Sequence, residues 1–270
     1  MANRASRRLV RAVAATIIIC FCAWGTSIAD DSDYVLGFRG DPGGGSLPEG
    51  WEHVTYLGKQ KNRFSLEGYP EAGVVAEASD DGRVLRVQSV GSVSALLVRP
   101  EVDLNELPLL SWRWKVNRVV GMARENERDR NDSAARVRVV FGGGGPELPS
   151  SGESLLNRLL EMRGIDRGPS EPGGMKIDYI WGSHFPEGTV INYPGSRNHR
   201  VVFLQSGREN TGQWIREERD LLVDYREFFG GTPSSLAGVL VFSDTDRTNE
   251  GVTAWFADLV LSGRRDDSSP

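Results

Sequence analysis

Two stretches of this chain alternate apolar and basic residues, and this period of two constrains the fold more than any other feature. Residues 136–141 place Val137, Val139 and Phe141 on one side, and residues 109–116 place two tryptophans and a valine on one side in the same way. A two-residue period is that of a β-strand whose two faces have different surroundings. We expect the apolar faces to be buried and the basic faces to meet solvent or anions. The basic side chains are Arg113, Lys115, Arg136 and Arg138.

Short apolar stretches separated by turn residues continue along the rest of the chain. The acidic turn Asp80-Asp81-Gly82 between two of them is typical of a hairpin. We expect strands at residues 34–38, 51–57, 63–66, 74–78, 84–88, 93–98, 109–116, 136–141, 177–181, 200–205, 214–218, 236–242 and 253–261. Because strands do not alternate with helices here, the sequence predicts an all-β fold, an antiparallel β-sandwich.

One short surface helix is predicted at residues 220–229, where Asp220 can cap the first turn and Gly230 can end the last. Residues 142–174 are rich in glycine and proline and contain one helical pattern at 153–162. We interpret them as a loop insertion, since they have too few apolar residues to bury a core. Residues 30–270 are expected to be one sandwich domain, with a flexible tail at 263–270.

The first 29 residues have the pattern of a secretory signal peptide. A basic beginning precedes an apolar segment at 13–24, and Ser27-Ile28-Ala29 offers small residues for cleavage after Ala29. The apolar segment is short for a bilayer span, although an uncleaved anchor is the alternative. We therefore expect a periplasmic or secreted protein without a stable membrane span after cleavage.

The composition of the mature chain excludes several classes of function. Both cysteines, Cys20 and Cys22, lie in the signal, so the mature chain has no disulfide, thiol nucleophile or cysteine-bound metal. Without the four arginines of the signal, 28 basic and 37 acidic residues remain, a net charge of −9. This acidic balance argues against nucleic acid as a partner. A GxGxxG turn before a helix and a P-loop are both lacking, which disfavours a nucleotide.

Several motifs, in a fixed order, carry a resemblance to a known family. They are Trp112-Arg113-Trp114-Lys115, Asp132-x-x-Ala135-Arg136-Val137, Tyr179-x-Trp181-Gly182, Trp214-x-x-Glu217-x-Arg219-Asp220, Asp224-Tyr225-Arg226-x-x-Phe229-Gly230 and Asp244-Thr245-Asp246. Together they resemble a bacterial exported family classified only as domain of unknown function 3047. The resemblance covers residues 51–261, and the 142–174 insertion departs from it. It implies export and a single domain, and it transfers no catalytic residue.

The end of the chain carries a second resemblance, at the level of the fold. An apolar strand, an acidic turn and the segment Ala254-Trp255-Phe256-Ala257-Asp258-Leu259 are similar to the closing strands of galactose-binding-like jelly rolls. That resemblance implies a jelly-roll, galactose-binding-like sandwich. Such sandwiches are often carbohydrate-binding modules, and some hold a structural calcium ion. The likeness is an analogy of fold and assigns no site by itself.

The basic strand faces allow two interpretations. Arg113, Lys115, Arg136 and Arg138 could line a groove for a carboxylated or phosphorylated ligand, because arginine offers a fork for such groups. Alternatively they pair internally with Asp129, Asp132, Asp244 or Glu217. In either case we expect Asp132 and Arg136 at one end of the sandwich, in a charge cluster with Arg113 and at least one of Asp244 and Asp246.

Residues 244–250 and the tryptophans supply the other binding candidates. Oxygen side chains alternate at Asp244, Asp246, Thr248 and Glu250, as in a calcium loop, but the spacing is not that of an EF-hand, and an acidic turn is the alternative. Asp244, Asp246 and Glu250 are the candidate metal ligands, with Ca²⁺ as the ion. The mature chain has six tryptophans, which could be stacking platforms or core. Trp181, beside His184, is the one we place near a ligand, together with His184.

These residues do not identify a particular reaction. Asp132, Glu217 and Asp244 are candidates for carboxylate catalysis of glycan cleavage, but their spacing does not show two of them facing one bond. The three histidines lack metal-ligand spacing, and no GxSxG elbow is present. The sequence favours an exported, non-catalytic binding module for an envelope or extracellular saccharide. The alternatives are a glycan hydrolase or lyase, and an envelope interaction protein without a small ligand.

Overall fold

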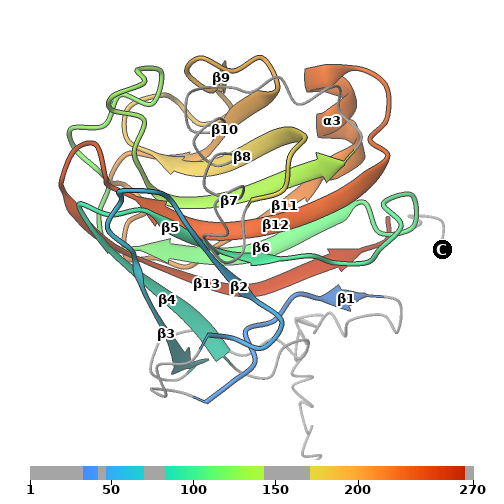
Figure 1. Ribbon diagram of the computed structural model, residues 1–270, viewed down its shortest axis with the longest axis horizontal. Helices are drawn as coiled ribbons and strands as arrows, with labels where there is room; N and C mark the ends of the chain where they lie inside the picture. Colours follow the sequence, from blue (N-terminus) through green and yellow to red (C-terminus); the bar gives the residue numbers. More distant parts are fainter. Residues whose placement is uncertain (1–32, 42–46, 70–82, 143–170, 265–270) are drawn as a thin grey trace, which may run out of the picture.

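The computed structural model describes residues 33–41, 47–69, 83–142 and 171–264. Several expectations fall outside these ranges: the signal at 1–29, the strand at 74–78, the helical pattern at 153–162 within the insertion, and most of the tail at 263–270. The described residues form two sheets packed face to face, with one helix at an end (Figure 1). The expectation of an all-β sandwich is confirmed.

The first sheet has six strands, and five of them follow one another across it. In order they are β11 (Ile215–Asp220), β6 (Leu109–Val116), β13 (Gly251–Ser262), β4 (Arg83–Val90) and β3 (Arg63–Gly68), and β1 (Tyr34–Val35) pairs with β13. All of these pairs are antiparallel. Residues 109–116 form a strand at the predicted bounds.

The second sheet has seven strands. In order they are β2 (Glu52–Thr55), β5 (Ser94–Val98), β12 (Ser235–Asp244), β7 (Ser133–Gly142), β8 (Met175–Gly182), β10 (His199–Ser206) and β9 (Val190–Asn192). Its pairs are antiparallel except β8 with β10, which run parallel. The short strand β9 was not predicted, because its three residues carry no alternating pattern long enough to be recognised.

The alternation in β6 and β7 places their apolar sides in one shared core. Trp112 and Trp114 of β6 are buried, and their ring centroids lie 5.5 Å apart. Trp112 packs on Tyr179 of β8 at 5.6 Å between centroids, and Trp114 packs on Trp181 of β8 at 6.0 Å. Aromatic pairs at such spacing add to the stabilisation from burial itself. Four large rings from two sheets therefore form the centre of the sandwich.

The helix α3 (Leu221–Phe229) closes one end of the sandwich, beside the end of β7 (Figure 1). Asp220 accepts hydrogen bonds from the backbone N–H groups of Leu222 and Val223, and Gly230 follows the last turn, as predicted. Tyr225 packs on Phe141 at 5.0 Å between ring centroids. Within the described residues, no helix is long and apolar enough to span a membrane.

Candidate functional site

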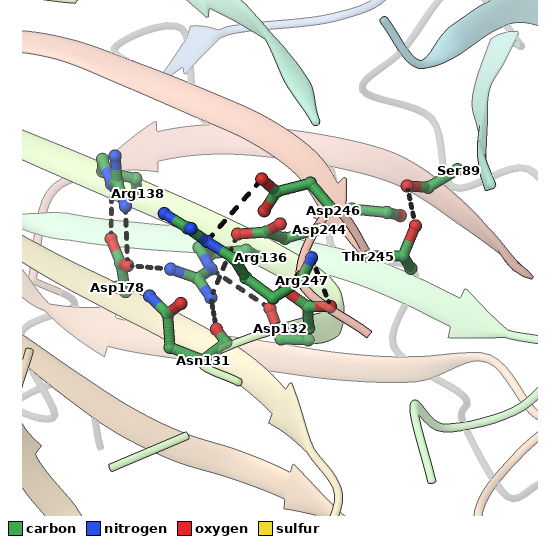
Figure 2. A network of polar contacts seen from close by, with 12 residues as sticks. Ser89, Asn131, Asp132, Arg136, Arg138, Asp178, Asp244, Thr245, Asp246 and Arg247 are labelled. Carbon is green, nitrogen blue, oxygen red and sulfur yellow. Dashed lines mark hydrogen bonds and ion pairs between the residues drawn. The ribbon is translucent and has the colours of Figure 1, made fainter. Parts of the chain in front are cut away.

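Three carboxylates from two distant segments of the chain meet beside the end of β12. Asp132 lies in the turn before β7, Asp244 ends β12, and Asp246 follows in the next loop. One oxygen from each lies within 4.8 Å of the others, and Asp132 and Asp244 are buried. We call Asp132, Asp244 and Asp246 the acidic triad (Figure 2). The predicted meeting of Asp132 with Asp244 and Asp246 is confirmed, whereas Asp129 remains exposed.

Asp132 fixes the loop that follows β12. Its carboxylate accepts hydrogen bonds from the backbone N–H groups of Arg247 and Thr248 and from the Thr248 hydroxyl, at 2.7 to 3.3 Å. Charge-assisted bonds to backbone donors are stronger than neutral ones. The turn before β7 and the loop after β12 are therefore held together by one side chain, 115 and 116 residues away from its two partners.

The other two members of the triad have fewer donors. Asp246 forms an ion pair with Lys59 and lies 3.7 Å from the Arg247 guanidinium. The Oδ2 atom of Asp244 lies 3.9 Å from Arg136, while its Oδ1 atom has no hydrogen-bond partner among the residues that the structure describes. Burial and repulsion from Asp132 and Asp246 raise the pKa of Asp244 well above its ordinary value, although Arg136 opposes this.

Arg136 and Arg138 are buried against Asp178 of β8, a partner that the sequence interpretation missed. Arg136 donates to Asp178 at 2.7 Å, and Arg138 donates to both of its oxygens at 2.6 and 2.9 Å (Figure 2). Burial opposes ionisation of Asp178, but Arg138, His199 and Arg136 hold its pKa well below the ordinary value. A lone acidic residue inside the apolar stretch at 177–181 was the available signal.

Further groups close this network. Arg138 and Lys176 both pair with Glu171, at 3.0 and 2.8 Å, and they lower its pKa to about 2 although burial alone would raise it. His199 lies 3.0 Å from Asp178, and burial lowers its pKa to about 4, so its ring is neutral at pH 7. Arg136 is only 2% exposed. For Arg136 and Arg138 the internal-pairing interpretation describes the structure.

The four basic side chains do not form one face, and Arg113 does not join the triad. Arg113 pairs with Asp258 on the outer side of the six-stranded sheet, whereas Arg136 and Arg138 lie on the outer side of the seven-stranded sheet. The reason is that β6 and β7 follow each other in sequence but belong to different sheets. Each buries its apolar side in the shared core, so their basic sides point in opposite directions.

A row of aromatic and basic side chains crosses the outer face of the six-stranded sheet. Lys115 of β6 is the register partner of Trp255 of β13, and Trp255 is that of Arg86 of β4. Trp214 directly precedes β11. The Lys115 ammonium lies 4.6 Å from the ring centroid of Trp255 and 4.9 Å from that of Trp214. We call Trp214, Lys115 and Trp255 the tryptophan–lysine row.

Polar groups beside this row hold its side chains in place. The Trp255 indole N–H donates to Glu67 at 3.0 Å, and Arg86 lies 3.4 Å from the same carboxylate. Asp258 accepts from Arg113 and Tyr69. Its φ of 51° falls at an irregularity in the pairing of β13. A bulge of this kind redirects a side chain, and here it turns a carboxylate toward the outer face.

The remaining predicted site residues are dispersed. Trp181 is completely buried in the core against Trp114, which corrects the expectation that it lies near a ligand. His184 is exposed, with Nε2 3.0 Å from the carbonyl oxygen of Gly121. Glu250 is separate from the triad, because it accepts from the Met122 N–H at 2.7 Å and from Arg118 at 2.8 Å. The acidic triad thus contains Asp132 in the place expected for Glu250.

The three catalytic candidates do not share one place. Glu217 belongs to β11 of the six-stranded sheet, and its carboxylate accepts hydrogen bonds from the Trp114 indole at 3.2 Å and from the Gln205 amide at 3.0 Å. Burial raises its pKa to about 7. Asp132 and Asp244 are close together but buried. A glycosidic bond needs two carboxyl groups about 5 to 10 Å apart with the sugar between them. The buried pair leaves no room for that sugar.

Fold and site together define a two-sheet β-sandwich with a buried charge network on one side and an aromatic, basic sheet face on the other. Among known families, this chain belongs to the one described as "Protein of unknown function (DUF3047)", which matches residues 49–260. The resemblance that the motifs carry is therefore confirmed. No curated protein matches the chain.

Two solved structures illustrate what the fold is similar to. The family 11 carbohydrate-binding module of the cellulosomal cellulase Lic26A-Cel5E of Clostridium thermocellum has 9% identity and a TM-score of 0.36, covering 88% of this chain and 98% of that one. An exo-β-agarase has 12% identity and a TM-score of 0.34, covering 87% of this chain and 26% of that one.

Proposed function

We propose that this protein is a non-catalytic binding module for a saccharide, and that the saccharide binds on the outer face of the six-stranded sheet. The observation that carries the proposal is the tryptophan–lysine row, in which the ammonium of Lys115 stands 4.6 and 4.9 Å from the ring centroids of two partly exposed tryptophans. An indole presents a broad apolar surface for the C–H face of a sugar, and adjacent polar groups can bond its hydroxyls.

The row is suited to binding because sheet strands and neighbouring polar groups hold it rigidly. Lys115 and Trp255 are register partners on adjacent strands, and Glu67 anchors the Trp255 indole at 3.0 Å. Side chains on strands keep their geometry better than side chains on loops, which lowers the entropy lost on binding. Asp258 and Arg113 place further hydrogen-bonding groups on the same face.

The proposed ligand is an envelope or extracellular saccharide, because we also propose that the chain is exported. The pattern in the first 29 residues supports export with cleavage after Ala29. Mass spectrometry of the native protein from fractionated cells tests this. A mature N-terminus at Asp30 in the periplasmic or external fraction is expected, and an intact N-terminus in the membrane fraction would contradict it.

A glycan array tests binding, with release of reducing sugar measured on every glycan that binds. We expect binding without release. Trp255→Ala and Trp214→Ala each remove one ring of the row and should weaken binding at least about tenfold. The reason is that a stacked aromatic ring adds binding free energy beyond that gained from the apolar area it buries. Tyr193→Ala is the matched control, because Tyr193 is a partly buried aromatic residue beside the other sheet, stacked on His199 at 4.3 Å.

Two outcomes would overturn the binding proposal. If no glycan binds, the remaining interpretation is an envelope interaction protein without a small ligand. If a glycan binds but both tryptophan variants retain full affinity while Tyr193→Ala loses it, the ligand lies on the seven-stranded sheet instead. Circular dichroism of each variant confirms that a loss of binding is not a loss of fold.

A glycan hydrolase is the second candidate, and one observation favours it. Glu217 has a pKa raised to about 7 by burial, and Glu187 is near enough to contribute to that rise. A carboxyl group that keeps its proton near neutral pH can act as a general acid, with a second carboxylate as base or nucleophile. Release of reducing sugar that is abolished in Glu217→Gln would establish this function. Binding without any release would reject it.

A further inference from the structure

The acidic triad brings three carboxylates together, and one of them, Asp244, has only a distant positive partner, Arg136 at 3.9 Å. Oxygens of Asp132, Asp244 and Asp246 lie within 4.8 Å of one another, and Asp132 and Asp244 are 0% and 7% exposed. Carboxylates removed from water are paired, take up a proton or coordinate a metal, because an unpaired buried charge is costly.

The protein donors nearby are already engaged. Lys59 pairs with Asp246, which also lies 3.7 Å from the partly exposed guanidinium of Arg247. Arg136 donates to Asp178 at 2.7 Å and lies 3.9 Å from Asp244. Asp132 is satisfied by backbone N–H groups and a hydroxyl of the loop after β12. These contacts leave Asp244 with the weakest compensation of the three.

The Oδ1 atom of Asp244 is an independent sign of a missing partner. It is buried, it has no hydrogen-bond donor among the described residues, and its carboxylate faces the other two members of the triad (Figure 2). A buried acceptor without a donor costs free energy that folded proteins rarely leave uncompensated. A cation between the three carboxylates would satisfy this atom directly.

We propose that Asp132, Asp244 and Asp246 bind a divalent cation of the Ca²⁺ class. Oxygens around one calcium ion lie about 2.3 to 2.6 Å from it, and therefore at most about 5 Å from one another, which the triad satisfies. Its donors are all carboxylate oxygens, which suit a hard cation better than zinc, whose sites in proteins favour cysteine and histidine. Calcium also accepts water and irregular geometry in the rest of its shell.

Bound Ca²⁺ would join two chain segments that are distant in sequence: the turn before β7, and the end of β12 with the loop that follows it. Arg247 and Thr248 of this loop already bond Asp132, so the ion would reinforce an existing junction. The site belongs to the seven-stranded sheet, whereas the proposed saccharide site belongs to the six-stranded sheet. The two proposals can therefore fail separately.

The test begins with purified protein freed of metal by a chelator and titrated with CaCl₂ in a calorimeter. We expect one saturable site per chain and a rise in Tm of about 5 to 10 °C when Ca²⁺ exceeds its Kd about a hundredfold. ZnCl₂ should give no comparable shift. The absence of saturable binding up to about 10 mM CaCl₂ would overturn the proposal.

Variants locate the site. Asp244→Asn and Asp246→Asn should each abolish the calcium-dependent Tm shift, and Asp244→Asn should remain folded in the chelator, because its Oδ1 atom has no donor to lose. Glu250→Gln is the matched control: it removes a carboxylate from the same loop, but one that Met122 and Arg118 engage elsewhere. Calcium binding that survives Asp244→Asn, or that disappears in Glu250→Gln, would refute the assignment.

Lys59→Met provides a test in the opposite direction. Lys59 is the nearer of two counter-ions of Asp246, the other being Arg247 at 3.7 Å, so its removal should weaken the pairing of that carboxylate and tighten Ca²⁺ binding several-fold. If the triad were only a structural ion-pair cluster, the same change would lower stability and leave no calcium response. A several-fold lower Kd supports the site, and an unchanged or weaker Kd contradicts it.

Discussion

At the scale of single residues, Asp178 is the group on which the buried charge network depends. It stands between Arg136, Arg138 and His199, and it is completely buried. Both arginines also face the ring of Phe242, at 5.4 and 5.1 Å. Arg136 also donates to the Ser133 hydroxyl and to the Asn131 carbonyl oxygen, but only carboxylates neutralise the two guanidinium charges, so each charge depends on a specific acidic partner.

Replacing Asp178 with asparagine should destabilise the protein severely. The change keeps the shape but leaves two buried guanidinium groups without their shared carboxylate, a loss of about 3 to 5 kcal/mol. Urea unfolding followed by circular dichroism measures the free energy of unfolding. Asp129→Asn makes the same charge change at an exposed position and should alter it by less than about 0.5 kcal/mol. Equal effects of the two variants would show that the network contributes nothing.

Glu217 should give the stability a distinct pH dependence. Its pKa is raised from 4.5 to about 7 in the folded protein, mainly by burial. Between these pH values the folded state keeps a proton that the unfolded state has released, so this residue's contribution to stability falls as the pH rises. Glu217→Gln has no such proton to lose. Relative to the wild type, the variant should gain about 1 kcal/mol between pH 5 and pH 8, allowing for partial exposure.

Urea unfolding at pH 5 and at pH 8 measures this gain. Glu218→Gln is the control, because Glu218 is the next residue on β11 and its side chain is exposed. The control should follow the wild type at both pH values. Parallel profiles of Glu217→Gln and the wild type would show that Glu217 is ionised in the folded protein throughout this range.

At the scale of elements, the cap of α3 can be separated from the ion pair that shares its residue. Asp220 accepts from two backbone N–H groups of the helix, and its other oxygen pairs with Arg264 at 2.7 Å. Asp220→Ala removes both interactions and should cost about 1 kcal/mol for the cap. Asp220→Asn keeps the capping acceptor, so thermal unfolding should show a much smaller loss. Equal losses would assign the effect to Arg264 instead.

The elements were largely predictable because their signals are local. Alternation identified β6 and β7, and a capping aspartate followed by a glycine stop identified α3. The partners were not predictable in the same way. The sequence places β6 and β7 next to each other, but nothing in their alternation shows that they lie in different sheets. The meeting of Arg113 with Asp258, and of Arg136 with Asp178, follows from that long-range choice.

The candidate sites show the same division between local and distant information. The acidic stretch at 244–250 was recognisable, and two of its carboxylates do lie together. The third member, Asp132, comes from 112 residues earlier, and Glu250 was displaced because Met122 and Arg118 engage it. The tryptophan–lysine row needed the register of three strands, which the alternation of a single strand does not contain.

At the scale of the whole molecule, the two sheets share one aromatic centre and should unfold together. Trp112 and Trp114 come from the six-stranded sheet, and Tyr179 and Trp181 from the seven-stranded sheet.

Trp181→Ala removes a large, fully buried side chain and should lower the free energy of unfolding by about 3 to 5 kcal/mol. Because the cavity would face both sheets, far-UV circular dichroism and tryptophan fluorescence should shift to the same lower midpoint. Tyr34→Ala, at a 39% exposed position, is the control and should leave the midpoint nearly unchanged. Two separate transitions in Trp181→Ala would show that each sheet is stable without the other, and would contradict a single sandwich domain over residues 30–270.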